Sequence, residues 1–133
     1  MQNKEREIME EETVEYFAIG SMMNLVSINM RGIYPLESRA ACLQDYELFF
    51  GMESGFAAAR RALCSEMHGV VHRITRQELD MLDKIEVWYV KDLVEVVPYN
   101  HEKKLPAVKA FVYVFDPKQK KIKMSSDFKI FAD

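Results

Sequence analysis

Apolar and polar positions alternate along much of the chain and predict a series of strands. Almost every position of residues 14–19 is apolar, which is typical of a strand buried on both faces. Shorter alternating runs predict further strands at residues 37–43, 46–50, 67–74, 88–97 and 107–115. We expect a turn through Gln44 and Asp45 between the first two of these runs, and a hairpin loop over residues 99–106 between the last two. Residues 51–61 show no decisive pattern.

Two short helices are predicted between the strands. Asn24 can cap a helix over residues 25–31 that ends at Gly32, and its inward positions would be Leu25, Val26 and Ile28. Thr75 and Glu78 have the spacing of a capping box, which predicts a helix that runs to about residue 85. The inward stripe of that second helix consists of Leu79, Leu82 and Ile85.

This mixture of elements predicts an α+β fold. Strands dominate and neighbouring strands can pair through short connections, so we expect a twisted, largely antiparallel sheet or barrel with short flanking helices. Residues 1–12 are nearly all polar or charged and are predicted to form a flexible tail. Residues 13–133 would then form a single domain.

Composition and charge narrow the class of protein. The net charge of −3 over 133 residues argues against a large basic surface for nucleic acid. No apolar run approaches the ~20 residues that a membrane helix needs, and the charged N-terminus is unlike a signal peptide. We therefore expect a cytoplasmic protein in which Cys42 and Cys64 are buried free thiols.

The first strand breaks at Gly20 and Ser21, and this break has two readings. Glycine permits a left-handed backbone that turns successive amides to one side, so Gly20, Ser21, Met22 and Met23 could cradle a carboxylate or phosphate. The alternative is a plain strand-to-helix turn that needs glycine for its geometry and serine for capping. The residues of the break alone favour this alternative.

Glu86 also has two readings. It follows the second predicted helix and stands among apolar neighbours, which are Ile85, Val87 and Trp88. A poorly solvated carboxylate has a raised pKa, which suits a general acid or base near neutral pH. Taken by itself, an exposed glutamate at a helix end is the simpler interpretation.

Three motifs, taken together, favour the functional readings of the Gly20 break and of Glu86. The first is EYFAIGSMMN, the second is Gly69 followed by two valines, and the third combines Leu82, Asp83, Glu86 and Tyr89. In this order and spacing they resemble the γ-glutamylcyclotransferase-like family, with similarity from about residue 16 to residue 115. The resemblance implies a small mixed, largely antiparallel β-barrel in which the first loop and Glu86 meet across one cavity.

The resemblance also implies an activity. The α-amine of a γ-glutamyl compound attacks its own γ-carbonyl, 5-oxoproline closes and an amine or amino acid leaves, as in glutathione metabolism. Glu86 would be catalytic and would move the proton. The residues expected to bind the small-molecule γ-glutamyl substrate are Ile19, Gly20, Ser21, Met22, Met23 and Tyr89. No cofactor or metal is expected, and the oligomeric state, a homodimer included, is left open.

Three departures from the family pattern leave a second hypothesis open. Ile19 replaces a common tyrosine, Met22 replaces a common asparagine, and Val87 replaces the usual glycine after the glutamate. The alternative to an enzyme is therefore an inactive relative that binds a small carboxylate as a regulatory module. His68 and His72 would share one face of a strand, but no third ligand is evident from the sequence, which favours sheet-face histidines over a metal site.

Overall fold

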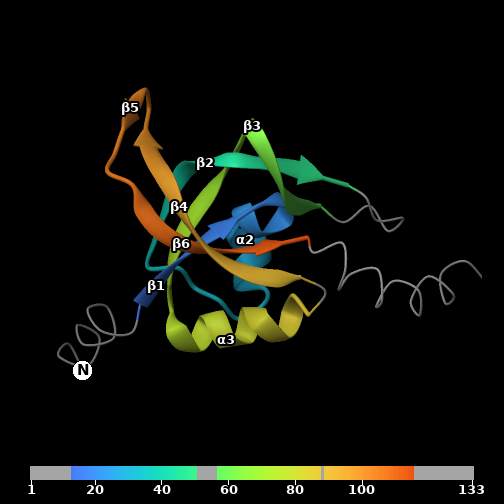
Figure 1. The fold of residues 1–133 in the computed structure, drawn as a ribbon. Coiled ribbons are helices and arrows are strands. Elements are labelled where there is room, and N and C mark those ends of the chain that lie inside the picture. Colours follow the sequence, from blue (N-terminus) through green and yellow to red (C-terminus); the bar gives the residue numbers. More distant parts are fainter. Residues whose placement is uncertain (1–12, 51–56, 88, 116–133) are drawn as a thin grey trace, which may run out of the picture.

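Strands make up most of the described chain (Figure 1). The computed structural model describes residues 13–50, 57–87 and 89–115, so the predicted tail, Trp88 and the C-terminal segment lie outside the described residues. The strands are β1 (Thr13–Ala18), β2 (Glu37–Phe49), β3 (Ala58–Thr75), β4 (Val90–Asn100), β5 (Lys103–Lys104) and β6 (Val108–Val114). The helices are the 3₁₀ helix η1 (Gly20–Met23), α2 (Leu25–Asn29) and α3 (Arg76–Ile85).

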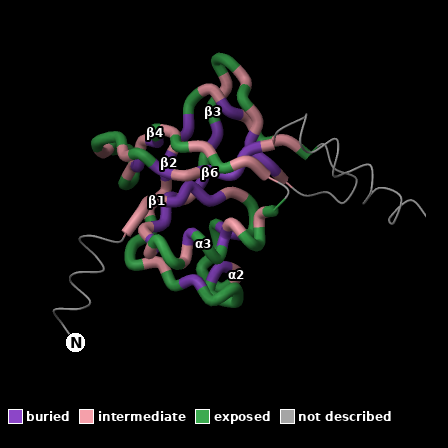
Figure 2. Tube along the Cα trace, turned by 60° about the horizontal axis from the view of Figure 1, so that its bottom comes forward, coloured by how far each residue is buried: buried purple, intermediate pink, exposed green. Residues whose placement is uncertain are grey.

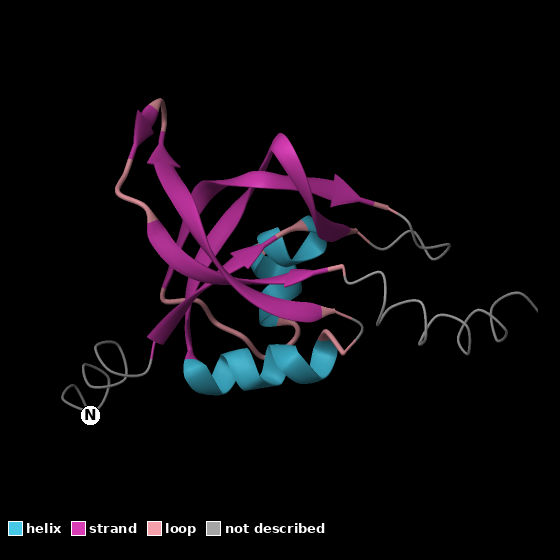
Figure 3. Cartoon of the chain, in the orientation of Figure 1, coloured by secondary structure: helices cyan, strands magenta, loops and turns pink. Residues whose placement is uncertain are grey.

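The strand pairings close into a ring. β1 pairs with β3, β3 with β2, β2 with β4 and β4 with β6, all antiparallel, and β6 returns to β1 in parallel. Helices α2 and α3 lie on the same side of these strands, and the β4–β5 hairpin projects away from them (Figure 3). This mixed, largely antiparallel sheet with a few short helices confirms the predicted α+β fold.

The buried hydrophobic side chains form two clusters, one on each face of the ring. Figure 2 shows buried stretches along the strands of the ring. The first cluster takes residues from all five strands of the ring and so fills its interior. The second joins β1, β3 and β6 to the three helices on the outside. In β1, Phe17 belongs to the first cluster while Tyr16 and Ala18 belong to the second, as strand alternation requires. Burial on both faces explains why this strand is apolar at nearly every position.

Gly69 lies against the end of β1. A Cβ atom added there would stand 2.5 Å from the Ala18 carbonyl oxygen and 2.7 Å from the Phe17 ring. Only glycine leaves room for this approach, so a glycine within a strand marks a close backbone contact, as expected.

The predicted turn at Gln44 and Asp45 is wrong. Residues 37–49 form one strand, β2, which pairs with β3 on both sides of a bulge between Gln44 and Tyr46. Asp45 has a φ of 66° at this bulge, and its Oδ1 accepts a hydrogen bond from the Cys64 amide at 3.0 Å. A bulge bends a strand without reversing it, so turn-forming residues here produce curvature. The loop predicted over residues 99–106 is likewise partly wrong, because Asn100 and Lys103 pair across a tighter hairpin.

Both helix caps are confirmed, but not all the inward positions. The Asn24 side chain accepts from the amides of α2, and Thr75 and Glu78 form the capping box of α3. Ile28, Leu79 and Leu82 are buried. Leu25, Val26 and Ile85 are exposed instead, because each stands near an end of a short helix, beyond the reach of the second cluster.

Candidate functional site

The turn after β1 begins with a backbone that favours glycine. Ile19 is extended, and Gly20 then takes a φ of 62° and starts η1. Ile19 is the N-cap residue of η1, and its side chain makes no capping hydrogen bond. The first amides of a helix have no acceptor within the helix. Asn24, and not Ser21, caps the following helix α2, with its Oδ1 2.7 Å from the Val26 nitrogen. The serine is therefore not needed as a cap, which weakens the plain-turn reading.

A buried histidine holds this turn in place. His72 of β3 has its Nε2 2.9 Å from the Met22 carbonyl oxygen and its Nδ1 2.7 Å from the Ser38 Oγ. A carbonyl only accepts, so Nε2–H donates to Met22 and the neutral ring accepts the Ser38 hydroxyl at Nδ1. Burial lowers the pKa of His72, although its hydrogen bond to Met22 opposes that shift. The neutral ring thus ties η1 to β3 and β2.

Glu86 ends α3 and is half-buried. Its amide donates to the Leu82 carbonyl at 2.7 Å, and its own carbonyl accepts from the Tyr89 amide at 3.2 Å. Val87, where glycine is usual in the family pattern, is not among the described non-glycine residues with positive φ, which are Asp45, Cys64 and His101. The turn that carries Glu86 therefore has no need of glycine at this position.

Asp83 anchors the end of α3 one turn before Glu86. Its Oδ1 accepts from the Tyr113 hydroxyl at 2.6 Å, and its Oδ2 accepts from Lys91 Nζ at 2.9 Å. Burial opposes ionisation, but the two hydrogen bonds and the Lys91 charge lower the pKa of Asp83 overall. The ionised Asp83 thereby fixes the helix end to β4 and β6.

A pocket of about 320 Å³ joins the two segments. Its wall contains Ile19, Gly20, Ser21 and Met22 from the turn together with Glu86 and Tyr89 from the end of α3 and the residues after it. Met23, the seventh predicted residue, lies outside this wall and lines a neighbouring cavity. The structure thus brings six of the seven predicted residues together, and their chemical roles stay predictions.

Three phenols surround the pocket, of which the sequence analysis singled out only Tyr89. Burial raises the pKa of Tyr16 and Tyr89, and the charge of Glu86 raises both further. For Tyr113, burial and the hydrogen bond to Asp83 raise the pKa, with smaller contributions that include Glu86. These tyrosines therefore stay protonated beside the Glu86 carboxylate. A polar-tipped aromatic within an otherwise apolar strand was the available signal for Tyr16 and Tyr113.

Arg31 is the one cationic side chain in the described wall of the pocket, and the sequence analysis missed it. Its Nη1 donates to the Ser27 carbonyl at 2.9 Å, which holds the side chain along α2. Its positive charge acts to lower the pKa of Tyr16 against the larger effects of burial and Glu86. As the last residue of a predicted helix, Arg31 carried no sequence signal of its own. The described wall of the pocket therefore contains one cationic side chain, Arg31, one carboxylate, Glu86, and the turn that begins at Gly20.

A comparison with known protein families identifies the family of the chain. A family model described as gamma-glutamyl cyclotransferase, AIG2-like, matches residues 16–129. The chain belongs to this family. No curated protein matches the chain in a direct sequence search.

Solved structures of other proteins share the architecture. An Arabidopsis thaliana protein solved in solution is 22% identical, with a TM-score of 0.66 over 92% of this chain and 90% of that one. An uncharacterized Homo sapiens protein is 26% identical, with a TM-score of 0.64 over 80% and 68%. A gamma-glutamyl cyclotransferase is 25% identical, with a TM-score of 0.65 over 79% and 68%. Within the described residues no helix is long and apolar enough to cross a membrane.

Proposed function

We propose that the chain cyclises a γ-glutamyl compound to 5-oxoproline and releases an amine or amino acid. The observation that carries this proposal is the shared pocket, in which the Gly20 turn and Glu86 meet although they are far apart in sequence. Membership of the family supports the same reaction class. A volume of about 320 Å³ lies at the small end of ligand pockets, which suits a substrate of dipeptide size.

The proposed reaction is an internal acyl transfer. The α-amine of the γ-glutamyl group forms a new C–N bond to its own γ-carbonyl carbon, and the bond from that carbon to the leaving nitrogen breaks. The α-amine is protonated at neutral pH, so Glu86 takes its proton and passes it to the departing nitrogen. The nucleophile is already tethered to its target, and holding one rotamer in the pocket supplies much of the acceleration.

Two features of the pocket would hold the carboxylates of the substrate. Gly20, Ser21 and Met22 line the pocket, and the backbone amides of this turn would bind the α-carboxylate or the developing oxyanion. Arg31 suits a second carboxylate, such as that of a leaving amino acid, because a guanidinium binds a carboxylate in a fork. The pocket therefore favours γ-glutamyl amino acids over γ-glutamylamines that lack this carboxylate.

Mass spectrometry for 5-oxoproline tests the reaction. The parent protein and the Glu86→Gln variant are offered a panel of γ-glutamyl amino acids and amines. We expect product from the parent and at least about a hundredfold less from Glu86→Gln, the range that general acid–base catalysis supplies. Asp80→Asn is the matched control, because Asp80 is an exposed carboxylate on the same helix and lies outside the pocket. Equal product from parent and Glu86→Gln would show that Glu86 is not the catalytic acid or base.

Substrate pairs test the role of Arg31. With γ-glutamylalanine and γ-glutamylethylamine, which differ by one carboxylate, Arg31→Gln should lower kcat/KM about tenfold to a hundredfold for the first substrate only, since a hydrogen bond between charged groups contributes about 1.5–3 kcal/mol. An equal loss on both substrates would assign Arg31 to a structural role.

The alternative function is a carboxylate-binding module without turnover. The buried side chain of Met22 favours it, because an apolar group fills the position where the family pattern has a polar amide. Product from neither protein across the panel, combined with a rise in melting temperature on adding glutamate or 5-oxoproline, would support this module over the enzyme.

A further inference from the structure

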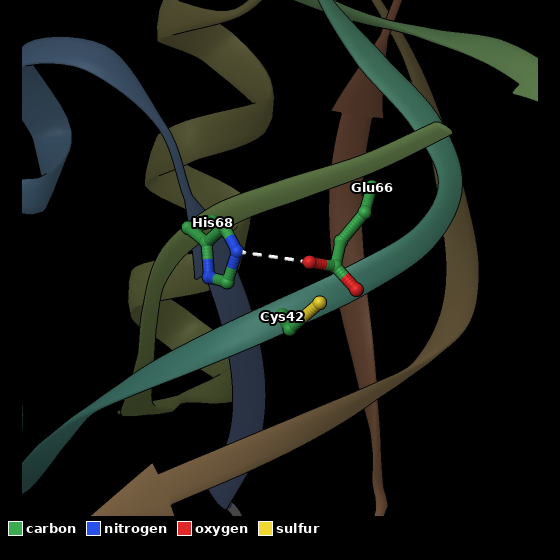
Figure 4. A group of neighbouring side chains, drawn as sticks. All are labelled: Cys42, Glu66 and His68. Carbon is green, nitrogen blue, oxygen red and sulfur yellow. Dashed lines mark hydrogen bonds and ion pairs between the residues drawn. The ribbon is translucent and has the colours of Figure 1, made fainter. Parts of the chain in front are cut away.

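A second group of reactive side chains lies on strands β2 and β3, outside the wall of the pocket that holds Glu86. Cys42 of β2 and His68 of β3 are direct partners across the two strands, and Glu66 stands two residues before His68 on the same face (Figure 4). None of these three residues lines the Glu86 pocket. Side chains on paired strands are held more precisely than side chains on loops, so the group is already positioned without a ligand.

The three donor atoms have the spacing of a metal site. One ligand atom from each of Cys42, Glu66 and His68 lies within 4.8 Å of the other two. His68 Nε2 is 3.1 Å from Glu66 Oε1. In a tetrahedral zinc site with ordinary bond lengths, neighbouring ligand atoms are about 3.3–3.6 Å apart. Small side-chain rotations would therefore bring all three atoms onto one ion.

His68 is also oriented as a ligand should be. Its Nδ1 is 3.1 Å from the hydroxyl of Tyr99 on β4, and the two rings meet edge to face at 79°. This contact occupies Nδ1 and leaves Nε2 directed at Glu66, as Figure 4 shows. A hydrogen bond at the second ring nitrogen is the usual way in which a protein fixes the ring and tautomer of a metal-binding histidine.

The surroundings are open and acidic enough for a cation. A cavity of about 380 Å³ borders all three side chains. Its wall adds the carboxylates of Glu95 and Glu102 and the imidazole of His101, against the single described cation Lys104. Solvent can reach the group through this cavity, which leaves a fourth position for water.

We propose that Cys42, Glu66 and His68 form a zinc site. A thiolate, an imidazole and a carboxylate are the donors that zinc takes in proteins, whereas magnesium and calcium select oxygen donors. Binding displaces the thiol proton to solvent and involves no change of oxidation state. The ion would clamp β2 to β3 at the pair that Cys42 and His68 form. The sequence places His68 and His72 on one strand face, but in the structure the partners of His68 are Glu66 and Cys42.

Cobalt(II) gives a direct test, because it substitutes for zinc and shows a thiolate-to-metal charge-transfer band. The full chain, without an affinity tag and stripped of metal by a chelator, is titrated with Co²⁺ and then with Zn²⁺. We expect a band that saturates at one cobalt per chain and disappears when zinc is added. Cys42→Ser should abolish the band, and Glu66→Gln and His68→Gln should each weaken binding by at least about tenfold.

Cys64→Ser is the matched control. Cys64 is the second free cysteine, it is exposed, and it stands on the same strand as His68 outside the proposed ligand set. It should keep the full band. A second measurement detects zinc itself: Zn²⁺ should raise the melting temperature of the parent and of Cys64→Ser but not of Cys42→Ser. Circular dichroism of each metal-free variant checks that it is folded.

Three results would overturn the proposal. The parent could show no charge-transfer band at stoichiometric cobalt. Cys64→Ser could lose the band as completely as Cys42→Ser. Folded Cys42→Ser could bind zinc with an affinity within about twofold of that of the parent, which would indicate adventitious binding elsewhere. None of these results bears on the formation of 5-oxoproline, so the two proposals stand or fall separately.

Discussion

His72 and His68 stand on one face of one strand, four residues apart, yet they occupy opposite environments. His72 is fully buried and both its ring nitrogens bond within the fold. The side chain of His68 is 58% exposed and meets Glu66 and Tyr99 in a cavity open to solvent. The same residue type thus becomes a fixed support in one place and an accessible donor in the other.

The difference between the two histidines comes from what crosses the strand. β1 pairs with β3 only from Val70 to Thr75, and beyond Ala18 the chain turns through Gly20 into η1. That turn lies over His72 and leaves His68 uncovered. Strand alternation therefore decides which face a side chain takes, but a distant segment decides whether the side chain is buried. The covered part of this face adjoins the turn that lines the Glu86 pocket, and the uncovered part carries His68 and Glu66 of the Cys42 group.

Replacing each histidine with alanine should give the largest difference between the covered and uncovered parts of β3, measured as the free energy of unfolding. We expect His72→Ala to lower the free energy of unfolding by about 2–4 kcal/mol, because it leaves the Met22 carbonyl without its donor, frees the Ser38 hydroxyl and opens a cavity. His68→Ala should change it by no more than about 0.5 kcal/mol. Urea unfolding followed by circular dichroism measures both. Equal losses of unfolding free energy in the two variants would show that η1 does not make the surroundings of His72 different from those of His68.

The fold was largely predictable because its signals are local. The capping box at Thr75, the cap at Asn24 and the alternation in β4 and β6 all appear within a few residues of sequence. The bulge at Asp45 was misread because a turn and a bulge use the same residue types, and only pairing with β3 tells them apart. Cys64, expected to be buried, is exposed; it lies in the stretch of β3 opposite this bulge, where its amide donates to Asp45, and Cys42 is only half-buried.

The candidate site was predictable only through three motifs in register. Glu86 and Gly20 each favoured a plain structural reading until they were considered together. Arg31 joins the pocket through tertiary packing, which no local pattern reports, and for Tyr16 and Tyr113 a polar-tipped aromatic in a strand was only a weak signal. The Cys42 group was missed for the same reason, because Cys42 and Glu66 become neighbours only when β2 pairs with β3.

Gly69 tests the place where the covered and open parts of β3 divide. Gly69→Ala should lower the free energy of unfolding by about 1–3 kcal/mol, because the new Cβ meets the Ala18 carbonyl and the Phe17 ring, and a backbone atom cannot move aside cheaply. Ser65→Ala, on the uncovered part of the same strand, is the control and should have little effect. If Gly69→Ala were as stable as the parent, β1 would not approach β3 as closely as the structure shows.

Acid should weaken the covered part of β3 through His72. Burial lowers the pKa of this residue in the folded state, whereas an unfolded histidine has a pKa of about 6.5. Its contribution to stability is therefore complete above about pH 6.5 and is lost as the pH falls through the folded pKa. The slope is at most about 1.4 kcal/mol per pH unit for one group.

Unfolding measured from pH 7.5 to pH 5 in the parent and in His72→Gln checks this dependence. The variant should lose stability less steeply than the parent, and any decline common to both proteins belongs to other groups. If the unfolding free energies of the two proteins fell in parallel with pH, His72 would either be already protonated in the folded state or have the same pKa in the folded and unfolded chain.

Two tyrosines allow the smallest and most selective comparison. Tyr113→Phe removes the hydrogen bond to Asp83 and should cost about 1 kcal/mol, since water can reach part of the Asp83 carboxylate and replace the donor. It should also slow the formation of 5-oxoproline, because Asp83 anchors the helix that carries Glu86, and it should leave cobalt binding unchanged. Tyr99→Phe removes the partner of His68 Nδ1 and should do the reverse, with cobalt binding weakened by about tenfold and turnover preserved. If each substitution affected both measurements equally, the two sites would be coupled, and the separation that the cover by η1 implies would be wrong.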